Sequence, residues 1–485
     1  MKSGVSRNRW LALVVLSLAQ LTVILDSTIV NIALPTAQRD LAFSDDSRQW
    51  VVTGYALAFG SLLLLGGRLC DLFGRKRLFI AGMIGFAAAS ALGGAAGGFG
   101  LLLIARIAQG AFAAVLAPAA LSMVSVTFAD NADERGRAFG VFGAISGAGG
   151  ALGLLLGGVL TQNLSWRWCL YVNVLIAAVA VAGALVFLVD RARPDRTRLD
   201  LAGTVLALAG LFGIVYGLGN AATRGWSDFW TVGPALLGVL LVVAFVLVER
   251  RVRDPLLPLS VVLDRDRGAS YLVIGISGTG GFAVFLFVTY YLAETLNFTP
   301  VQSGLAFLPM VVLVMVGAVF SGAVLLPRVG PRPIVAIGSL LAAVGMVLLT
   351  GIDADSTYTG GVLPGLLVIG LGLGMVFGPG QNAATSGVRP HETGVASAMA
   401  NITQQVGGSI GLAVFSSLGA TATTHYLTAH GASASNPATI AQATLSGYHF
   451  VFWIAAALFL AGALVSAGLF RGGRLPVNPE PVLTH

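Results

Sequence analysis

Apolar stretches of about 18 or more residues recur along the whole chain, and they constrain its fold more than any other feature. As a helix, each stretch is long enough to cross a hydrocarbon core about 30 Å thick. Charged residues make up only 10% of the 485 positions, against about 25% in soluble domains. The alternating segments of about ten residues that typify a transmembrane β-barrel are absent from the sequence. The sequence therefore predicts an all-α polytopic membrane protein.

Hydropathy predicts fourteen transmembrane helices, and their even number places both termini on one side of the membrane. The predicted spans are 10–34, 49–69, 78–98, 100–129, 138–160, 168–189, 200–220, 230–249, 268–293, 300–326, 333–352, 361–386, 394–419 and 447–470.

The distribution of basic residues predicts which side holds the termini. Of the 28 lysines and arginines, 23 lie in segments on the side of the termini, and four lie on the other side. Cytoplasmic loops carry the excess of basic residues. We therefore expect both termini in the cytoplasm and the chain in a bacterial plasma membrane. Topology and contact with anionic lipids account for the net charge of +7, and no nucleic acid partner is expected.

An internal repeat divides the chain. The segment "ERGRAFGVFGAISGAGGALGL" from Glu134 aligns without gaps with "ETGVASAMANITQQVGGSIGL" from Glu392, at an offset of 258. Repeated six-helix units occur in alternating-access transporters, whose substrate site lies near the middle of the membrane between the repeats. We predict an N-terminal six-helix bundle at 1–190, two inserted linker helices at 191–267 and a C-terminal six-helix bundle at 268–485.

The segment "GGRLCDLFGRKR" (66–77) concentrates one acid, four bases and three glycines. Bases are expected in a cytoplasmic loop, but topology does not explain the acid or the spaced glycines. In the second repeat, at an offset of 256, Gly74 corresponds to Gly330 while Asp71 corresponds to Pro327. Gly74 can adopt the positive φ that a tight turn requires. Asp71 is expected to pair with a neighbouring arginine or to meet a helix N-terminus.

Asp26 and Arg106 place charges deep inside predicted spans. Such a charge costs about 2.5–3.5 kcal/mol on insertion scales, so both are expected to face the bundle interior. Burial disfavours the charged form of a carboxyl group, which lets Asp26 alternate between charged and neutral forms. A direct or water-bridged pair between the two would be released when Asp26 takes up a proton. The alternatives are a structural pair for Asp26 and a static polar anchor for Arg106.

Uncharged polar residues in the spans supply candidates for a substrate cavity, because polar groups that face lipid are costly. We expect Asn31, Tyr55 and Gln404 to line the cavity. Glu294 lies near the outer end of a predicted span. It is either a solvated helix end or a group that attracts cations at the outer mouth.

Several segments together carry a resemblance to a known family. They are "LDSTIVNIALP" (25–35), "GGRLCDLFGRKR" (66–77), "RIAQG" (106–110) and "SWRWCLYVN" (165–173). With them the chain resembles the 14-helix drug:proton antiporter branch of the major facilitator superfamily along nearly its whole length. The antiporter motif of the fifth helix is recognisable in Gly153, Gly157 and Gly158, with Leu154 where the family has a proline.

The resemblance implies a role for the charged loop and for the glycines of the fifth helix. The loop would lock the outward-facing state from the cytoplasmic side. The glycines would form a leak-proof hinge against the second repeat, or would serve packing alone, since four-residue spacing already lets helices approach closely. The loop residues that match the motif are Gly67, Asp71, Gly74, Arg75 and Lys76.

The expected function is alternating-access export of hydrophobic or cationic drugs in exchange for protons. By resemblance, Arg106 and Gln109 take part in proton transfer, with Asp26 as the coupling carboxylate. The proton gradient replaces any cofactor, and no G-x-x-x-x-G-K-[ST] motif for ATP occurs in the sequence. A dedicated exporter of one metabolite such as an antibiotic, a lipid exporter and a proton-coupled uptake symporter remain alternatives. No catalytic or metal site is expected, and the chain is expected to act as a monomer among membrane lipids.

Overall fold

The computed structural model describes residues 2–128, 132–189, 200–252, 257, 259–388, 393–429 and 437–473, and these form no β-strand. The first part of the chain contains α1 (Lys2–Leu41), α2 (Asp45–Phe73), α3 (Arg75–Gly94), α4 (Phe99–Thr127), α5 (Ala132–Asn163) and α6 (Trp168–Phe187). A helical hairpin, α7 (Leu201–Arg224) and α8 (Phe229–Glu249), follows.

The last part of the chain interrupts its α-helices with short π-helical turns, labelled η. The order is α9 (Leu259–Val262), α10 (Arg265–Ala283), η1 (Val284–Val288), η2 (Tyr291–Thr295), α11 (Pro300–Phe320), η3 (Ser321–Leu325), α12 (Leu326–Val329), α13 (Pro331–Leu349), η4 (Tyr358–Val362), α14 (Leu363–Thr385), α15 (Thr393–Ala429) and α16 (Pro437–Leu469).

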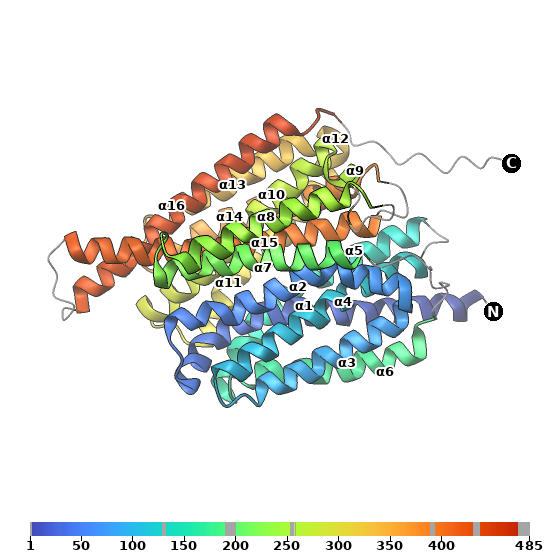
Figure 1. The fold of residues 1–485 in the computed structure, drawn as a ribbon, viewed down its shortest axis with the longest axis horizontal. Helices are drawn as coiled ribbons and strands as arrows, with labels where there is room; N and C mark the ends of the chain where they lie inside the picture. The colour runs from blue at the N-terminus through green and yellow to red at the C-terminus, as the bar shows by residue number, and fades with distance from the viewer. Residues whose placement is uncertain are drawn as a thin grey trace.

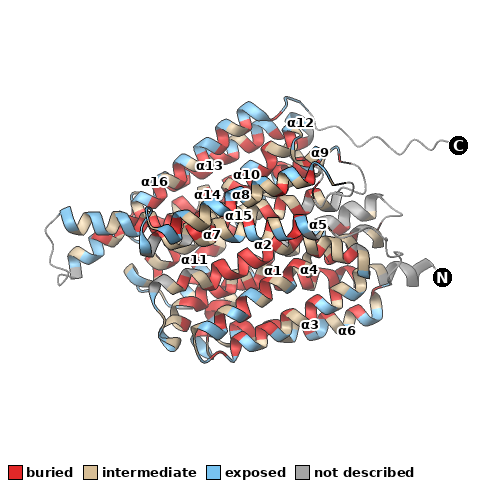
Figure 2. Cartoon of the chain, in the orientation of Figure 1, coloured by how far each residue is buried: buried red, intermediate tan, exposed pale blue. Residues whose placement is uncertain are grey.

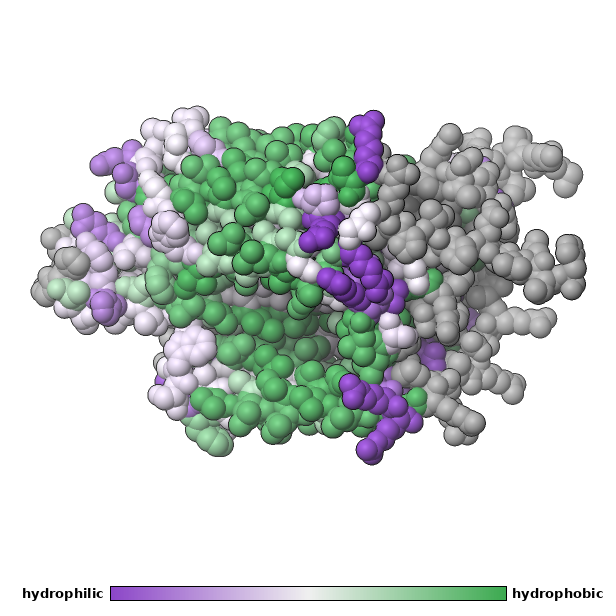
Figure 3. All heavy atoms as spheres, turned by 90° about the horizontal axis from the view of Figure 1, so that it is seen from above, coloured by the Kyte–Doolittle hydropathy of each residue, from purple (hydrophilic) through white to green (hydrophobic). Residues whose placement is uncertain are grey.

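The helices have the length and surface of membrane spans. Among the described residues, eleven helices are long and apolar enough to cross a bilayer, and two shorter apolar helices occur at 50–63 and 202–218. Hydrophobic side chains form a broad belt on the outer surface, with hydrophilic residues on both sides of it (Figure 3). The chain is thus a multi-pass membrane protein, while the number of fourteen spans stays a prediction.

Helices of the two halves have matching neighbours (Figure 1). In the first half, α1 packs on α5 and α6, α2 on α4, and α3 on α4 and α6. In the second half, α10 packs on α15 and α16, α11 on α14, and α13 on α14 and α16. The α7–α8 hairpin contacts both halves, through α2 and α15. We call these halves the N-bundle (α1–α6) and the C-bundle (α10–α16); the domain boundaries given above stay predictions.

Equivalent glycines end α2 and α12. Gly74 has φ 90° and its N–H donates to the Cys70 carbonyl at 3.1 Å. Gly330 has φ 74° and its N–H donates to the Leu326 carbonyl at 3.1 Å. Positive φ is inexpensive only for glycine, so each position fixes a sharp turn into the next helix. The shared geometry agrees with the repeat offset of 256.

Buried residues concentrate along the helix interfaces, while lipid-side positions are exposed (Figure 2). At one end of the molecule, Ala398 and Ile402 of α15 share an apolar cluster with Phe59 and Phe142 of the N-bundle. Toward the other end, Ile32 of α1 joins the apolar cluster of the C-bundle. We call this second end, where α1 finishes, the outer end, because the charge distribution predicts that it lies outside the cell.

Candidate functional site

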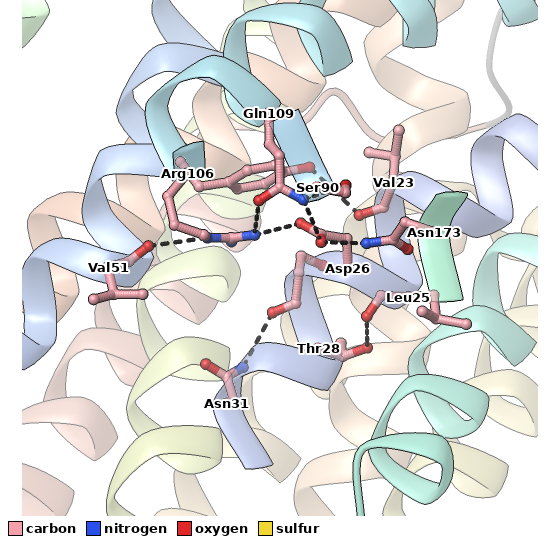
Figure 4. A network of polar contacts seen from close by, with 12 residues as sticks. Val23, Leu25, Asp26, Thr28, Asn31, Val51, Ser90, Arg106, Gln109 and Asn173 are labelled. Carbon is pink, nitrogen blue, oxygen red and sulfur yellow. Dashed lines mark hydrogen bonds and ion pairs between the residues drawn. The ribbon is translucent and has the colours of Figure 1, made fainter. Parts of the chain in front are cut away.

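Asp26 lies within α1, is fully buried, and accepts hydrogen bonds from three side chains (Figure 4). Its Oδ2 lies 2.5 Å from Nη1 of Arg106. Its Oδ1 accepts from Nε2 of Gln109 at 2.9 Å and from Nδ2 of Asn173 at 2.7 Å. The donors come from α4 and α6, so the carboxylate joins three helices of one bundle. The direct alternative for the Asp26–Arg106 pair is confirmed in this structure.

Arg106 keeps several partners besides Asp26. Its Nε donates to the Val51 carbonyl of α2 at 3.2 Å, and its Nη1 donates to Oε1 of Gln109 at 2.9 Å. The ring of Tyr55 lies 4.4 Å from the guanidinium carbon, in a cation–π arrangement. Besides Asp26, the guanidinium therefore contacts a backbone carbonyl, a side-chain amide and an aromatic ring.

Gln109 connects the charge pair to a fourth helix. Residues three apart on a helix share a face, which places Gln109 beside Arg106 on α4. Its Nε2 donates both to Asp26 and to Oγ of Ser90 on α3, the latter at 2.7 Å. Desolvation makes a buried ion pair weak evidence for stability, and ionisable residues inside the membrane are by default functional. The network is the candidate coupling site.

Tyr55 was expected to line a substrate cavity, but it lies inside this network. It is only 2% exposed, its ring covers Arg106, and its hydroxyl donates to the Val23 carbonyl at 3.4 Å. Its ring contacts the charge pair, because an aromatic face stabilises a guanidinium placed over it. Asn31 is half-buried and donates to the Ser27 carbonyl of its own helix at 3.3 Å. Gln404 is half-buried on α15.

Asn173 and Ser90 were not among the predicted site residues. Asn173 is a fully buried amide within an apolar helix, and it ends the segment "SWRWCLYVN", so its polarity was a usable signal. Ser90 lies among alanines and glycines of α3, where nothing in the sequence distinguishes it from a packing residue.

In the predicted gating loop, the structure assigns a structural contact to Lys76. Its Nζ donates to the carbonyls of Leu188 at 2.7 Å and Leu185 at 3.2 Å, which caps the C-terminal end of α6. A Cβ added at Gly67 would lie 3.9 Å from Cβ of Pro118 on α4, at ordinary van der Waals distance. Arg75 is the first residue of α3. The side chain of Asp71 lies outside the described residues, so its gating role stays a prediction.

The glycines of α5 pack against α1. A Cβ at Gly153 would meet the Thr28 hydroxyl, and one at Gly157 would lie 3.0 Å from the Ile29 carbonyl. Gly158 is buried in the same helix. The contact with the C-bundle falls instead on Leu154, whose carbonyl approaches Gly304 of α11. The glycines thus hold α5 close to the segment of α1 that carries Asp26, and the residue at the family's proline position contacts the second bundle.

A cavity of about 230 Å³ lies between the bundles at the outer end. Its walls come from α1 on one side and from the η1–α11 region on the other. The lining residues are Ile32, Pro35, Thr36, Arg39, Thr289, Ala293, Asn297, Phe298 and Ser303. Glu294 is exposed nearby on η2, where its Oε2 accepts from the Tyr448 hydroxyl at 3.4 Å.

Comparisons with known proteins agree with this architecture. The puromycin resistance protein of Streptomyces alboniger is 49% identical over 465 residues, which cover 96% of this chain and 92% of that protein. The cephamycin export protein of Amycolatopsis lactamdurans is 38% identical over 83% of each chain. Among solved structures, an auto-inhibited POT family peptide transporter has a TM-score of 0.68 at 17% identity, covering 97% of this chain and 99% of its own, which shows a shared fold. The sequence model of the Major Facilitator Superfamily matches residues 16–412. The chain therefore belongs to the Major Facilitator Superfamily and is a membrane transporter, not an enzyme.

Proposed function

We propose that the protein exports antibiotic-like small molecules across a bacterial plasma membrane in exchange for protons, with both termini in the cytoplasm. One observation carries the coupling: Asp26 is fully buried and is held by Arg106, Gln109 and Asn173. The relatives named for puromycin resistance and cephamycin export support the cargo class. A single chain supplies both walls of the inter-bundle cavity at the outer end, so a monomer suffices.

The network links protonation of Asp26 to movement of α1. Protonation removes the charge of Asp26 and weakens its bond to Arg106, which keeps its bonds to Val51 and Gln109. The freed carboxyl lies on α1, which packs closely on α5 at Gly153. Because α5 in turn contacts α11 through Leu154, a shift of α1 reaches the inter-bundle contact. A proton moving down 100 mV supplies about 2.3 kcal/mol for the cycle.

The test is puromycin-evoked proton release from the purified protein, together with proton-driven puromycin transport in proteoliposomes. Asp26→Asn preserves the size of the side chain and an oxygen that Gln109 and Asn173 can still donate to. We expect the variant to fold and bind puromycin, yet to release no protons and to lose nearly all transport against a gradient. Normal coupling in Asp26→Asn would exclude this carboxylate as the coupling site.

A dedicated exporter of one antibiotic is the second candidate. It is favoured by relatives whose names each specify a single compound or compound class. Transport of a panel of chemically unrelated drugs distinguishes the two functions. A dedicated exporter moves one scaffold, whereas a multidrug exporter moves several with affinities that differ by small factors.

A further inference from the structure

A second buried guanidinium lies between the bundles, apart from the coupling site. Among the described residues, Arg48 and Arg106 are the two bases that are less than 10% exposed. Arg48 belongs to the first turn of α2, at the outer end. Its guanidinium carbon lies 3.9 Å from the ring centroid of Tyr290, in the C-bundle. A cation of one bundle therefore rests on an aromatic face of the other.

The surface that receives Arg48 has the composition of a site for organic cations. Phe287 packs edge-on against both Tyr290 and Tyr448, with ring centroids at 6.4 and 5.7 Å. The Tyr448 hydroxyl donates to the carboxylate of Glu294, one turn beyond Tyr290. Aromatic faces beside a carboxylate attract organic cations and give about 0.5–2 kcal/mol per cation–π contact. We call these four residues the outer aromatic site.

The backbone around this site supports a functional role. Tyr290 stands between two π-helical turns, η1 and η2. Such turns are rare and often occur at functional sites. The same stretch supplies Thr289, Ala293 and Asn297 to the outer cavity of about 230 Å³. Thr289 and Ala293 are the chain neighbours of Tyr290 and Glu294, so the outer aromatic site and this cavity share one stretch of backbone.

We propose that the outer aromatic site binds cationic cargo during export and that Arg48 is an internal competitor for it. The proposal rests on the export function proposed above. When the outer ends of the bundles separate, Arg48 leaves with the N-bundle and the site is open to an organic cation. When they close, Arg48 occupies the face of Tyr290 again and displaces the cation outward. The exchange opposes re-entry of the cargo, because Arg48 is tethered to the chain and the released cation is diluted.

The experiment measures binding to the purified full-length protein by titration calorimetry with two probes. One is the permanent cation tetraphenylphosphonium, and the other is uncharged triphenylphosphine oxide, which has a similar aromatic body. Glu294→Gln and Tyr290→Leu should weaken tetraphenylphosphonium binding about five- to tenfold and leave the neutral probe within twofold. Arg48→Ala should tighten tetraphenylphosphonium binding by a similar factor, and Arg48→Lys should stay near wild type.

Arg224→Ala is the matched control, because Arg224 is an exposed base in the last turn of α7, at the same end of the molecule. It should leave both affinities unchanged. Equal changes for the two probes, or no tetraphenylphosphonium binding by the wild type, would overturn the outer aromatic site. Glu294 is exposed, so its variant should fold even if an Arg48 variant does not. Failure of proton release with these binding results intact would instead overturn the proposed coupling.

Discussion

Asp26 lies deep within α1, whereas Asp266, on the equivalent first helix of the C-bundle, lies in the first turn of α10. Asp26 is fully buried and pairs with a fully buried arginine. Asp266 accepts from the backbone N–H of Arg471 at 2.7 Å and lies 3.5 Å from its guanidinium, which is 61% exposed. One pair holds charge inside the membrane-spanning region, and the other closes the end of a helix.

The N-bundle has the more deeply buried charge pair, but the C-bundle has the more irregular backbone. All four π-helical segments of the described chain, η1 to η4, belong to the C-bundle. A π turn inserts a residue into the α-helical repeat and locally weakens its hydrogen-bond ladder. The N-bundle therefore holds the buried charge pair in α-helices, while the C-bundle holds the π-helical segments. The candidate coupling site and the irregular backbone thus lie in different bundles.

Removal of the buried cation gives the largest expected effect. Arg106→Ala leaves the Asp26 carboxylate buried without its counter-ion, which costs about 3–5 kcal/mol of stability. Adding Asp26→Asn removes the stranded charge and should recover most of that loss, without restoring proton-coupled transport. Thermal unfolding of the purified variants, read beside puromycin transport, measures both. Equal stability of Arg106→Ala and wild type would show that the pair contributes no more than the ion pair of Asp266.

The close packing of α5 on α1 gives an intermediate effect. Gly153→Ala places a methyl group against Thr28 and the Leu25 carbonyl, at 2.9 Å from the latter. Overpacking of this kind costs about 1–3 kcal/mol, and transport should fall because α1 moves away from its partner. Gly150→Ala is the control, since a Cβ there meets nothing within 4 Å. It should leave unfolding temperature and transport near wild type. An equal loss in both variants would show that contact with α1 is not the cause, and helix propensity would not explain the loss either, since alanine favours a helix more than glycine does.

The chemistry of the N-bundle was largely predictable, because a charge within an apolar span has few possible partners. That argument led to Asp26 and Arg106, and the repeat led to the turns at Gly74 and Gly330. Uncharged polar residues were harder to place. The polarity of Tyr55 predicts that its side chain faces the interior of the bundle. It does not predict whether the side chain lines a cavity there or packs on a guanidinium.

The π turns of the C-bundle and its contact with Arg48 were not predictable from the sequence. A π turn adds a single residue, and a span that is apolar on every side has no periodicity in which that addition would show. Arg48 was counted only as one of the four bases on the outer side. Its contact with Tyr290 joins residues 242 positions apart in different bundles. Alignment of the two repeats shows which positions are equivalent, but it does not predict which residues of the two bundles meet at the outer end.

The smallest effect is expected at the C-bundle pair. Asp266→Asn removes the charge while retaining an oxygen that can accept from the Arg471 N–H. The partner guanidinium is mostly exposed, and ion pairs of this kind contribute about 0–1 kcal/mol. Unfolding temperature should therefore fall only slightly, and puromycin-evoked proton release should match wild type, in contrast with Asp26→Asn. Loss of proton release in Asp266→Asn would place a second titrating carboxylate in the first turn of α10 and would show that proton coupling is not confined to the N-bundle.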